Sequence, residues 1–261
     1  MVVFSGFWDA AGELGKVLLP TECVGCGAWD EEICDTCLAQ MLGRPFPLEI
    51  SEDEDNVTGV PVFAIAKYDG PMRRVVLTGK HDKRRDLRRY FTAAGQSAVQ
   101  GLVSEGLLAR DKSGTDGTIR EEVFVVPAPS THPRDPSEVA AAFAQGAARG
   151  LVRAGLCRQA SVLEILELAA GSTTQAGLGW ESRNLNRHGK MQVRGSTTVA
   201  KRELAGKSLL IIDDVSATGA TLREMIRVLS GLDAAVLAGL VFASSRREMP
   251  CLLYTSPSPR D

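Results

Sequence analysis

The chain has 261 residues, of which 44% are hydrophobic and 24% are charged, a composition typical of a globular protein with room for one α/β domain and a small additional module. The formal net charge is −2, so any contact with nucleic acid or membrane must come from a local patch. Apolar stretches are shorter than the roughly 20 residues that span a bilayer, and the N-terminus lacks the features of a secretory signal. We therefore expect a cytoplasmic protein.

Two motifs are expected within residues 1–43. Apolar residues between Phe4 and Leu18 recur at helical spacing, which predicts a short amphipathic helix. Four of the six cysteines follow as two CxxC pairs, namely Cys23, Cys26, Cys34 and Cys37. Each pair places two thiolates on one tight turn, and two such turns form a tetrahedral zinc site, with an iron–sulfur centre as the alternative. Because four thiolates leave no open ligand position, we expect structural Zn²⁺.

A linker and a basic segment are expected next. Residues 44–59 are rich in proline and acidic residues, which predicts a solvated linker to a larger domain at residues 60–250. The first strand of that domain is expected at residues 60–68, where small and apolar residues alternate. Residues 67–89 carry nine basic and three acidic residues, a net charge of +6.

This basic segment has two interpretations. Apolar residues between 87 and 102 recur at helical spacing, so the arginines are expected on the opposite, solvated face. The segment is then only a soluble surface. Alternatively, it contacts pyrophosphate or a nucleic-acid backbone, and Lys80 is the candidate pyrophosphate ligand.

A second anion site is expected after the strand at residues 122–126. The Pro-Ala-Pro loop that follows offers donors from Ser130, Thr131 and Arg134. An Asp-Pro-Ser-Glu sequence then begins a helix with an N-cap, a proline at the first position and a glutamate at the third. A strand end that leads into a helix N-terminus suits a phosphate. These three side chains are candidate pyrophosphate ligands, and a rigid connecting turn is the alternative.

Residues 171–190 are unusually long for a connection. They are polar and punctuated by glycine, and long loops in compact domains are commonly lids or binding loops. The candidate lid residues are Gln175, Arg183, Asn184 and Arg187.

Residues 208–221 combine a strand, two adjacent carboxylates and a small-residue loop. The apolar run at 209–212 suits a buried parallel strand. Asp213 and Asp214 then lie at its carboxyl edge, where open α/β sheets bind ligands. The loop leads into a helix whose N-terminus is an anion site. Carboxylates for sugar hydroxyls beside a phosphate cradle predict a ribose-5-phosphate pocket, and a plain strand–loop–helix turn is the alternative.

These elements, with a last strand at residues 234–243, predict an α/β fold in which a mostly parallel sheet has helices on both faces.

Residues 208–221 resemble the phosphoribosyl pyrophosphate (PRPP) motif of type I phosphoribosyltransferases. The resemblance implies that Asp213 and Asp214 are the catalytic pair that binds the ribose 2′- and 3′-hydroxyls. It also implies a 5′-phosphate site made of Ser216, Ala217, Thr218, Gly219, Ala220 and Thr221. Ser216 stands where relatives usually carry an aliphatic residue, and Ala217 lacks the hydroxyl of a frequent threonine. One lost phosphate hydrogen bond is worth at most about 1.5–3 kcal/mol.

The order of motifs between residues 14 and 245 resembles the ComF family of phosphoribosyltransferase-like proteins. The features are the four-cysteine module, the Tyr-Asp-Gly turn before the basic segment, the Pro-Ala-Pro loop, the loop containing Gln175 and the Asp pair. The Pro-Ala-Pro loop departs from the family by lacking the glycine of its usual Arg-Gly run. The resemblance implies a Rossmann-like type I phosphoribosyltransferase fold after a small zinc module.

The same resemblance implies a phosphoribosyltransferase that transfers the phosphoribosyl group of PRPP to an unknown acceptor, with Mg²⁺ bound to PRPP. A lid would exclude water while C1 of the sugar develops oxocarbenium character. Members of the family are associated with natural transformation. The alternative function is therefore a competence accessory that binds single-stranded DNA, with the PRPP pocket as a sensor or relic.

Residues 251–261 are expected to be foreign to the protein. Their sequence resembles the translation of a sequencing adapter, and their Pro/Ser composition does not continue the preceding strand pattern. They are treated like a fusion scar, and a genuine disordered tail is the alternative.

Overall fold

The computed structural model describes residues 21–49, 59–108, 119–130, 138–169, 189 and 191–245. The helices are α2 (Asp35–Met41), α3 (Gly70–His81), α4 (Arg88–Ser104), α5 (Glu138–Arg153), α7 (Thr197–Leu204) and α8 (Ala220–Ser230). The strands are β1 (Phe46–Pro47), β2 (Val62–Lys67), β3 (Arg120–Pro127), β4 (Cys157–Val162), β5 (Leu166–Leu168), β6 (Met191–Val193), β7 (Ser208–Ser216) and β8 (Ala235–Ser244). The expected N-terminal helix and the tail at 251–261 lie outside the described residues.

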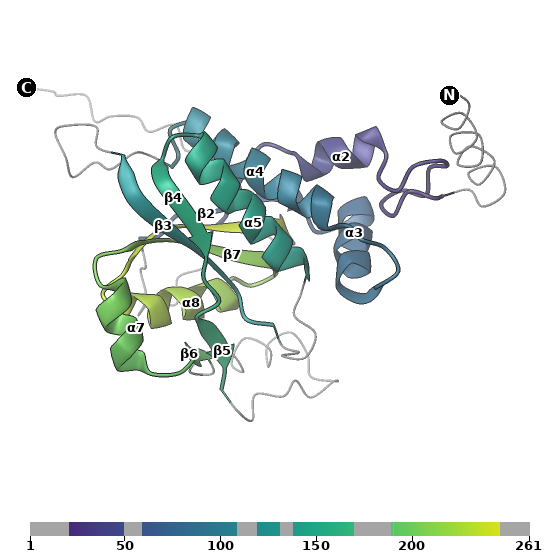
Figure 1. Cartoon of the computed structure of the whole chain (residues 1–261). Coiled ribbons are helices and arrows are strands. Elements are labelled where there is room, and N and C mark those ends of the chain that lie inside the picture. The colour runs from purple at the N-terminus through teal and green to yellow at the C-terminus, as the bar shows by residue number, and fades with distance from the viewer. Residues whose placement is uncertain are drawn as a thin grey trace, which may run out of the picture.

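A six-stranded sheet in the order β1-β2-β8-β7-β3-β4 forms the centre of the molecule (Figure 1). Strand β1 is antiparallel to β2, and every other neighbouring pair in this sheet is parallel. Strands β5 and β6 form a separate antiparallel pair. The central position of β7 brings its carboxyl end between the carboxyl ends of β8 and β3, which is where such sheets bind ligands.

Helices cover both faces of the sheet, which confirms the predicted fold class (Figure 1). Helices α2 to α5 pack on one face, and α7, α8 and the β5–β6 pair pack on the other. Side chains of β7 alternate between the two cores: Leu210 and Ile212 enter the first, and Leu209 and Ile211 enter the second. Because both faces are buried, β7 is a continuous apolar run rather than an alternating one.

Helices α4 and α5 pack against each other at two glycines. A Cβ atom on Gly95 would lie 2.1 Å from the carbonyl oxygen of Phe143, and one on Gly146 would lie 1.9 Å from that of Thr92. The two backbones therefore touch where any side chain would separate them. This close contact explains why both helices are rich in small residues.

The structure differs from the sequence-based expectations in three places. Phe46–Pro47 lies within the predicted linker but pairs with β2, and Leu48 is buried in the core. The basic segment divides between α3, a connection and the start of α4, rather than lining one helix. The strands β4, β5 and β6 were not expected, because they are short and mix polar with apolar residues. Among the described residues, no helix is both long and apolar enough to cross a membrane.

Candidate active site and cysteine cluster

The two adjacent aspartates occupy the last part of β7, which extends through Ser216 instead of ending before the acidic pair. Both residues are buried, with Asp213 7% and Asp214 9% exposed. The backbone N–H of Asp214 donates to Oδ1 of Asp213 at 2.8 Å. Burying two neighbouring carboxylates is costly unless they have partners, which makes this pair a candidate functional site.

A short loop connects the aspartates to α8. Gly219 adopts the left-handed conformation (φ 75°) at the N-cap, where a side chain would be strained. The N–H of Ala220 donates to Oγ1 of Thr218 at 3.4 Å, and Nη1 of Arg223 donates to the Thr218 carbonyl at 3.1 Å. The loop is therefore held against the N-terminus of α8, whose N–H groups and dipole favour an anion.

Ser216 is placed differently from the rest of the predicted phosphate loop. It is the last residue of β7, its side chain is buried, and its Oγ has no hydrogen-bond partner among the described residues. The Ser244 hydroxyl donates to the Ser216 carbonyl at 3.0 Å. The accessible part of the loop begins at Ala217, which is exposed. A phosphate contact by Ser216 stays a prediction.

Lys80 reaches the aspartates from the last turn of α3. Its Nζ lies 2.7 Å from Oδ2 of Asp214, and the two side chains are 27% and 12% exposed. The sequence indicates Lys80 as a pyrophosphate ligand, but it gives no indication of this ion pair. The structure therefore places a cation beside the acidic pair.

The other predicted ligands are only partly described. Ser130 is half-buried in the loop after β3, and the N–H of Ala128 fixes the start of that loop by donating to the Ile212 carbonyl at 2.7 Å. This contact holds the loop beside the carboxyl end of β7. The remaining candidates lie outside the described residues: Thr131, Arg134, Gln175, Arg183, Asn184 and Arg187.

Helix α8 also carries a buried carboxylate that sequence reasoning missed. Glu224 is 3% exposed and accepts the N–H of Gly189 at 2.9 Å. Arg227 donates to both of its carboxylate oxygens, at 2.8 and 2.7 Å. Burial alone raises the pKa of Glu224, but Arg227 and the N–H groups of Met191 and Gly189 outweigh it and hold the pKa below its usual 4.5. The spacing of Glu224 and Arg227 is the only sequence signal for this pair.

We expect Glu224→Gln to reduce the acid sensitivity of the protein. A carboxyl whose pKa is lower in the folded state stabilises the fold above its unfolded pKa, and this stabilisation is lost as the pH falls through the folded pKa. The free energy of unfolding should therefore fall less steeply below about pH 4.5 in Glu224→Gln than in the wild type. At pH 7 the variant should be less stable by about 1–3 kcal/mol.

Denaturant titrations between pH 3 and 7 measure this effect. The matched control is Glu203→Gln, which changes an exposed carboxylate on α7. If the free energy of unfolding of Glu224→Gln falls as steeply at low pH as that of the wild type, the buried pair of Glu224 and Arg227 does not contribute to the acid sensitivity.

The four cysteines at 23–37 converge as predicted. Their sulfur atoms all lie within 4.8 Å of one another, and the Sγ atoms of Cys26 and Cys34 are 3.4 Å apart. A tetrahedral zinc site with Zn–S bonds of about 2.3 Å has S–S distances of about 3.8 Å. The donor set and its spacing therefore fit one metal ion, and this cluster could hold it.

Local structure lowers the pKa of one cysteine of the cluster and raises the pKa of two others, Cys34 and Cys37. Burial raises the pKa of Cys23, but hydrogen bonds from the backbone N–H groups of Cys34, Cys26 and Gly25 lower it to about 6. Burial, together with the other sulfur atoms, raises the pKa of Cys37. A cation among the four sulfurs would favour the ionised form of all of them.

Three arginines of the basic segment contact this cysteine cluster. Nε of Arg74 donates to the Gly25 carbonyl at 2.6 Å, and Nη1 of Arg85 donates to the Glu22 carbonyl at 2.9 Å. Arg89 pairs with Glu32 at 3.0 Å. The segment expected to be a solvated helix face therefore also holds the cysteine cluster against the domain.

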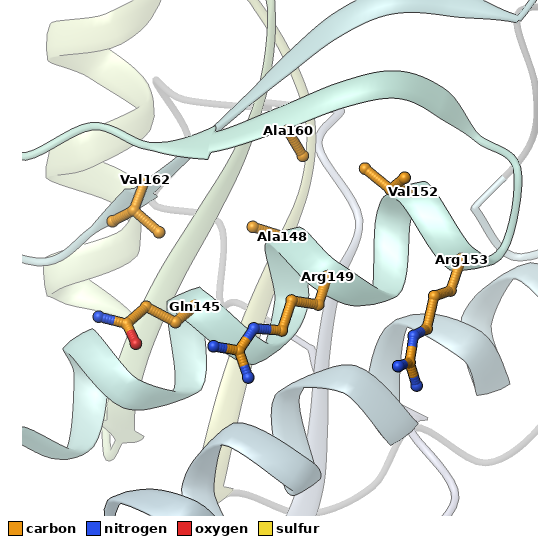
Figure 2. Close-up of a pocket in the computed structure, with 7 residues that line it drawn as sticks. All are labelled: Gln145, Ala148, Arg149, Val152, Arg153, Ala160 and Val162. Atoms are coloured by element: carbon orange, nitrogen blue, oxygen red, sulfur yellow. The ribbon is translucent and has the colours of Figure 1, made fainter.

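A separate hollow lies at the edge of the sheet (Figure 2). It has a volume of about 470 Å³ and is lined by α5 and β4. Arg149 and Arg153 extend from α5 in the same direction, and Val162 and Ala160 face the helix from β4. Strand β3 separates β4 from β7 in the sheet. The hollow is therefore distinct from the acidic pair.

Comparison with protein families locates a known domain in this part of the chain. No curated protein matches the chain. Residues 158–250 match the model of the phosphoribosyl transferase domain. The matched range includes β7, the acidic pair, the predicted phosphate loop and α8, and it begins after the cysteine cluster, α3, α4 and α5. Together with the sheet topology, the match identifies residues 158–250 as similar to a phosphoribosyl transferase domain, in a chain with the type I phosphoribosyltransferase fold.

Proposed function

We propose that this protein binds PRPP at the carboxyl end of β7 and acts as a phosphoribosyltransferase homologue of the ComF type. One observation carries the proposal. The buried pair Asp213 and Asp214 lies in the last part of the central parallel strand, which leads through Gly219 into the N-terminus of α8. This arrangement offers carboxylates to a sugar and backbone N–H groups to a phosphate.

Each side chain has a distinct role in the proposed site. The two aspartates accept hydrogen bonds from the ribose hydroxyls and orient the sugar. The loop at 217–221 binds the 5′-phosphate, and Lys80 offsets negative charge beside Asp214. The reaction would replace the pyrophosphate on C1 of PRPP with an acceptor nitrogen. Among the described residues no side chain is an evident general base, so the rate would come from positioning and electrostatics.

Mg²⁺ is the cofactor that PRPP chemistry implies. Magnesium prefers oxygen ligands and is usually bound through one or two carboxylates together with substrate phosphates. The oxygens of Asp213 and Asp214 fit that preference, and bound Mg²⁺ would offset the charge of the leaving pyrophosphate. For the cysteine cluster we propose structural Zn²⁺, because four sulfur ligands suit that ion and leave no position for a reactant.

The alternative, a competence accessory that binds single-stranded DNA, has less support. Its basis is the charge of residues 67–89, but Arg74, Arg85 and Arg89 contact the cysteine cluster, and Lys80 contacts Asp214. Arg84 and Arg88 pair with Asp82 and Asp86 beside them. Their side chains stay largely exposed, and a DNA backbone would have to compete with these pairs.

Calorimetric titration of the wild-type protein with PRPP and Mg²⁺ tests the proposal. We expect PRPP to bind more tightly than ribose 5-phosphate or pyrophosphate, because it engages both halves of the site, and we expect binding to weaken without Mg²⁺. Single-stranded DNA titrated at two salt concentrations tests the alternative in the same experiment. DNA binding without any PRPP binding would overturn the proposal in favour of the accessory role.

A further inference from the structure

We propose that Arg74 is a positioning residue for the PRPP site. Through α3 it connects the cysteine cluster to the Lys80–Asp214 ion pair, so that metal in the cluster and PRPP increase each other's affinity. This inference rests on the proposed function, because it adds regulation to the same site.

The first step is the contact between α3 and the first CxxC turn. Nε of Arg74 donates to the Gly25 carbonyl at 2.6 Å in a partly buried setting. A Cβ atom on Gly25 would lie 2.6 Å from Sγ of Cys37 and 3.4 Å from Cβ of Pro71. The turn is therefore confined between a cysteine of the second pair and the first turn of α3. A change in the separation of the two cysteine pairs would be transmitted to the helix.

The second step is a shared core. Cys37 and Met41 are completely buried, and they belong to the same apolar cluster as Met72, Val75 and Val76 of α3. Interiors of this kind are close-packed, so displacements pass from one side chain to the next instead of being absorbed.

The third step is the far end of α3. Lys80 lies six residues after Arg74, or about 9 Å along the helix axis, and its Nζ is 2.7 Å from Oδ2 of Asp214. The one helix thus contacts the cysteine cluster near its start and the acidic pair at its end. Its position determines whether the ammonium group reaches Asp214.

The cluster is also open to exchange with solvent. Cys26 is exposed and lines a hollow of about 470 Å³ together with Arg74, Asp82 and Arg85. An ion in the cluster could therefore enter or leave at this corner without unfolding the domain. The affinity of the proposed site for PRPP would then depend on whether the cysteine cluster holds a metal ion.

Reciprocal binding measurements test the inference. The PRPP dissociation constant is measured by calorimetry for zinc-loaded and zinc-stripped protein, and zinc affinity is measured with a chromophoric chelator in the presence and absence of PRPP and Mg²⁺. We expect each ligand to tighten the other by the same factor, about 5-fold or more. Equal PRPP affinity in the zinc-loaded and stripped proteins, both folded by circular dichroism, would overturn the inference.

Two arginine variants test whether the coupling between the cysteine cluster and the PRPP site passes through Arg74 and α3. In Arg74→Ala the cysteines, Lys80 and the aspartates are intact, and we expect the mutual effect to disappear. The matched control is Arg73→Ala, which removes the neighbouring arginine of α3. Both arginines are exposed, and we expect Arg73→Ala to keep the effect. A coupling that persists in Arg74→Ala would overturn the route through α3.

A third measurement separates this inference from the proposed function. Reductive methylation followed by mass spectrometry reports the accessibility of Lys80 without any PRPP. We expect Lys80 to be methylated several-fold faster in Arg74→Ala than in Arg73→Ala, both loaded with zinc. If that difference is found but PRPP does not bind, the proposed function fails while the structural coupling stands. If PRPP binds and Lys80 reacts equally in both variants, the coupling fails alone.

Discussion

Cys37→Ser should lower the thermal unfolding midpoint by about 8–16 °C, which corresponds to about 4 kcal/mol for a domain of this size. Cys37 is fully buried, and its sulfur atom is part of both the metal-binding cluster and the apolar core that contains α3. The substitution removes a metal ligand and leaves a hydroxyl without a suitable partner, and both changes act in the same direction. Structural zinc contributes about 10–16 kcal/mol to the folding free energy of zinc-finger peptides. A loss of about 4 kcal/mol is therefore a conservative expectation.

Differential scanning calorimetry with and without a zinc chelator measures this loss. The matched control is Cys157→Ser, because Cys157 is also buried but lies outside the cluster. We expect the chelator to lower the midpoint of the wild type and of the control, and to have little effect on Cys37→Ser. If the chelator leaves the wild-type midpoint unchanged and the protein contains no zinc, the cysteine cluster is not a structural metal site.

The acidic site could be predicted from the sequence because its signals are local. An apolar run predicts a strand buried on both faces, and the two acidic residues after it are placed by the rule that parallel sheets bind ligands at their carboxyl edge. The small-residue loop predicts the N-terminus of α8 in the same way. These features depend on neighbours in the chain, so little tertiary information was needed. The extension of β7 through Ser216 and the ion pair between Lys80 and Asp214 were missed.

The contacts of the basic segment could not be predicted because their partners are distant or generic. Arg74 and Arg85 bind backbone carbonyl groups of the first cysteine turn, and every sequence offers such acceptors. The pairing of Lys80 with Asp214 depends on the direction that α3 takes after β2, which is a tertiary property. The net charge of residues 67–89 therefore indicated a cationic surface that could bind a ligand. In the structure, several of these side chains contact other parts of the protein instead.

The acidic pair should account for most of the PRPP affinity. A hydrogen bond between a charged carboxylate and a ribose hydroxyl contributes about 1.5–3 kcal/mol. Asp213→Asn and Asp214→Asn should therefore each raise the PRPP dissociation constant by about 10- to 150-fold. The double variant should raise it by about 10²- to 10⁴-fold if the two effects are additive.

The two single variants are expected to differ in how they depend on Lys80. Asp214→Asn removes the carboxylate that Lys80 contacts, so Lys80→Met should add little to it. Asp213→Asn leaves that ion pair intact, and Lys80→Met should therefore weaken PRPP binding further. Double-mutant cycles by calorimetry measure these terms. The control is Asp233→Asn, because Asp233 pairs with Lys201 at 3.0 Å on the surface after α8. Wild-type affinity in the folded double aspartate variant would contradict a role for the pair in binding the sugar, since both carboxylates are buried at the one strand end where the ribose is expected to lie.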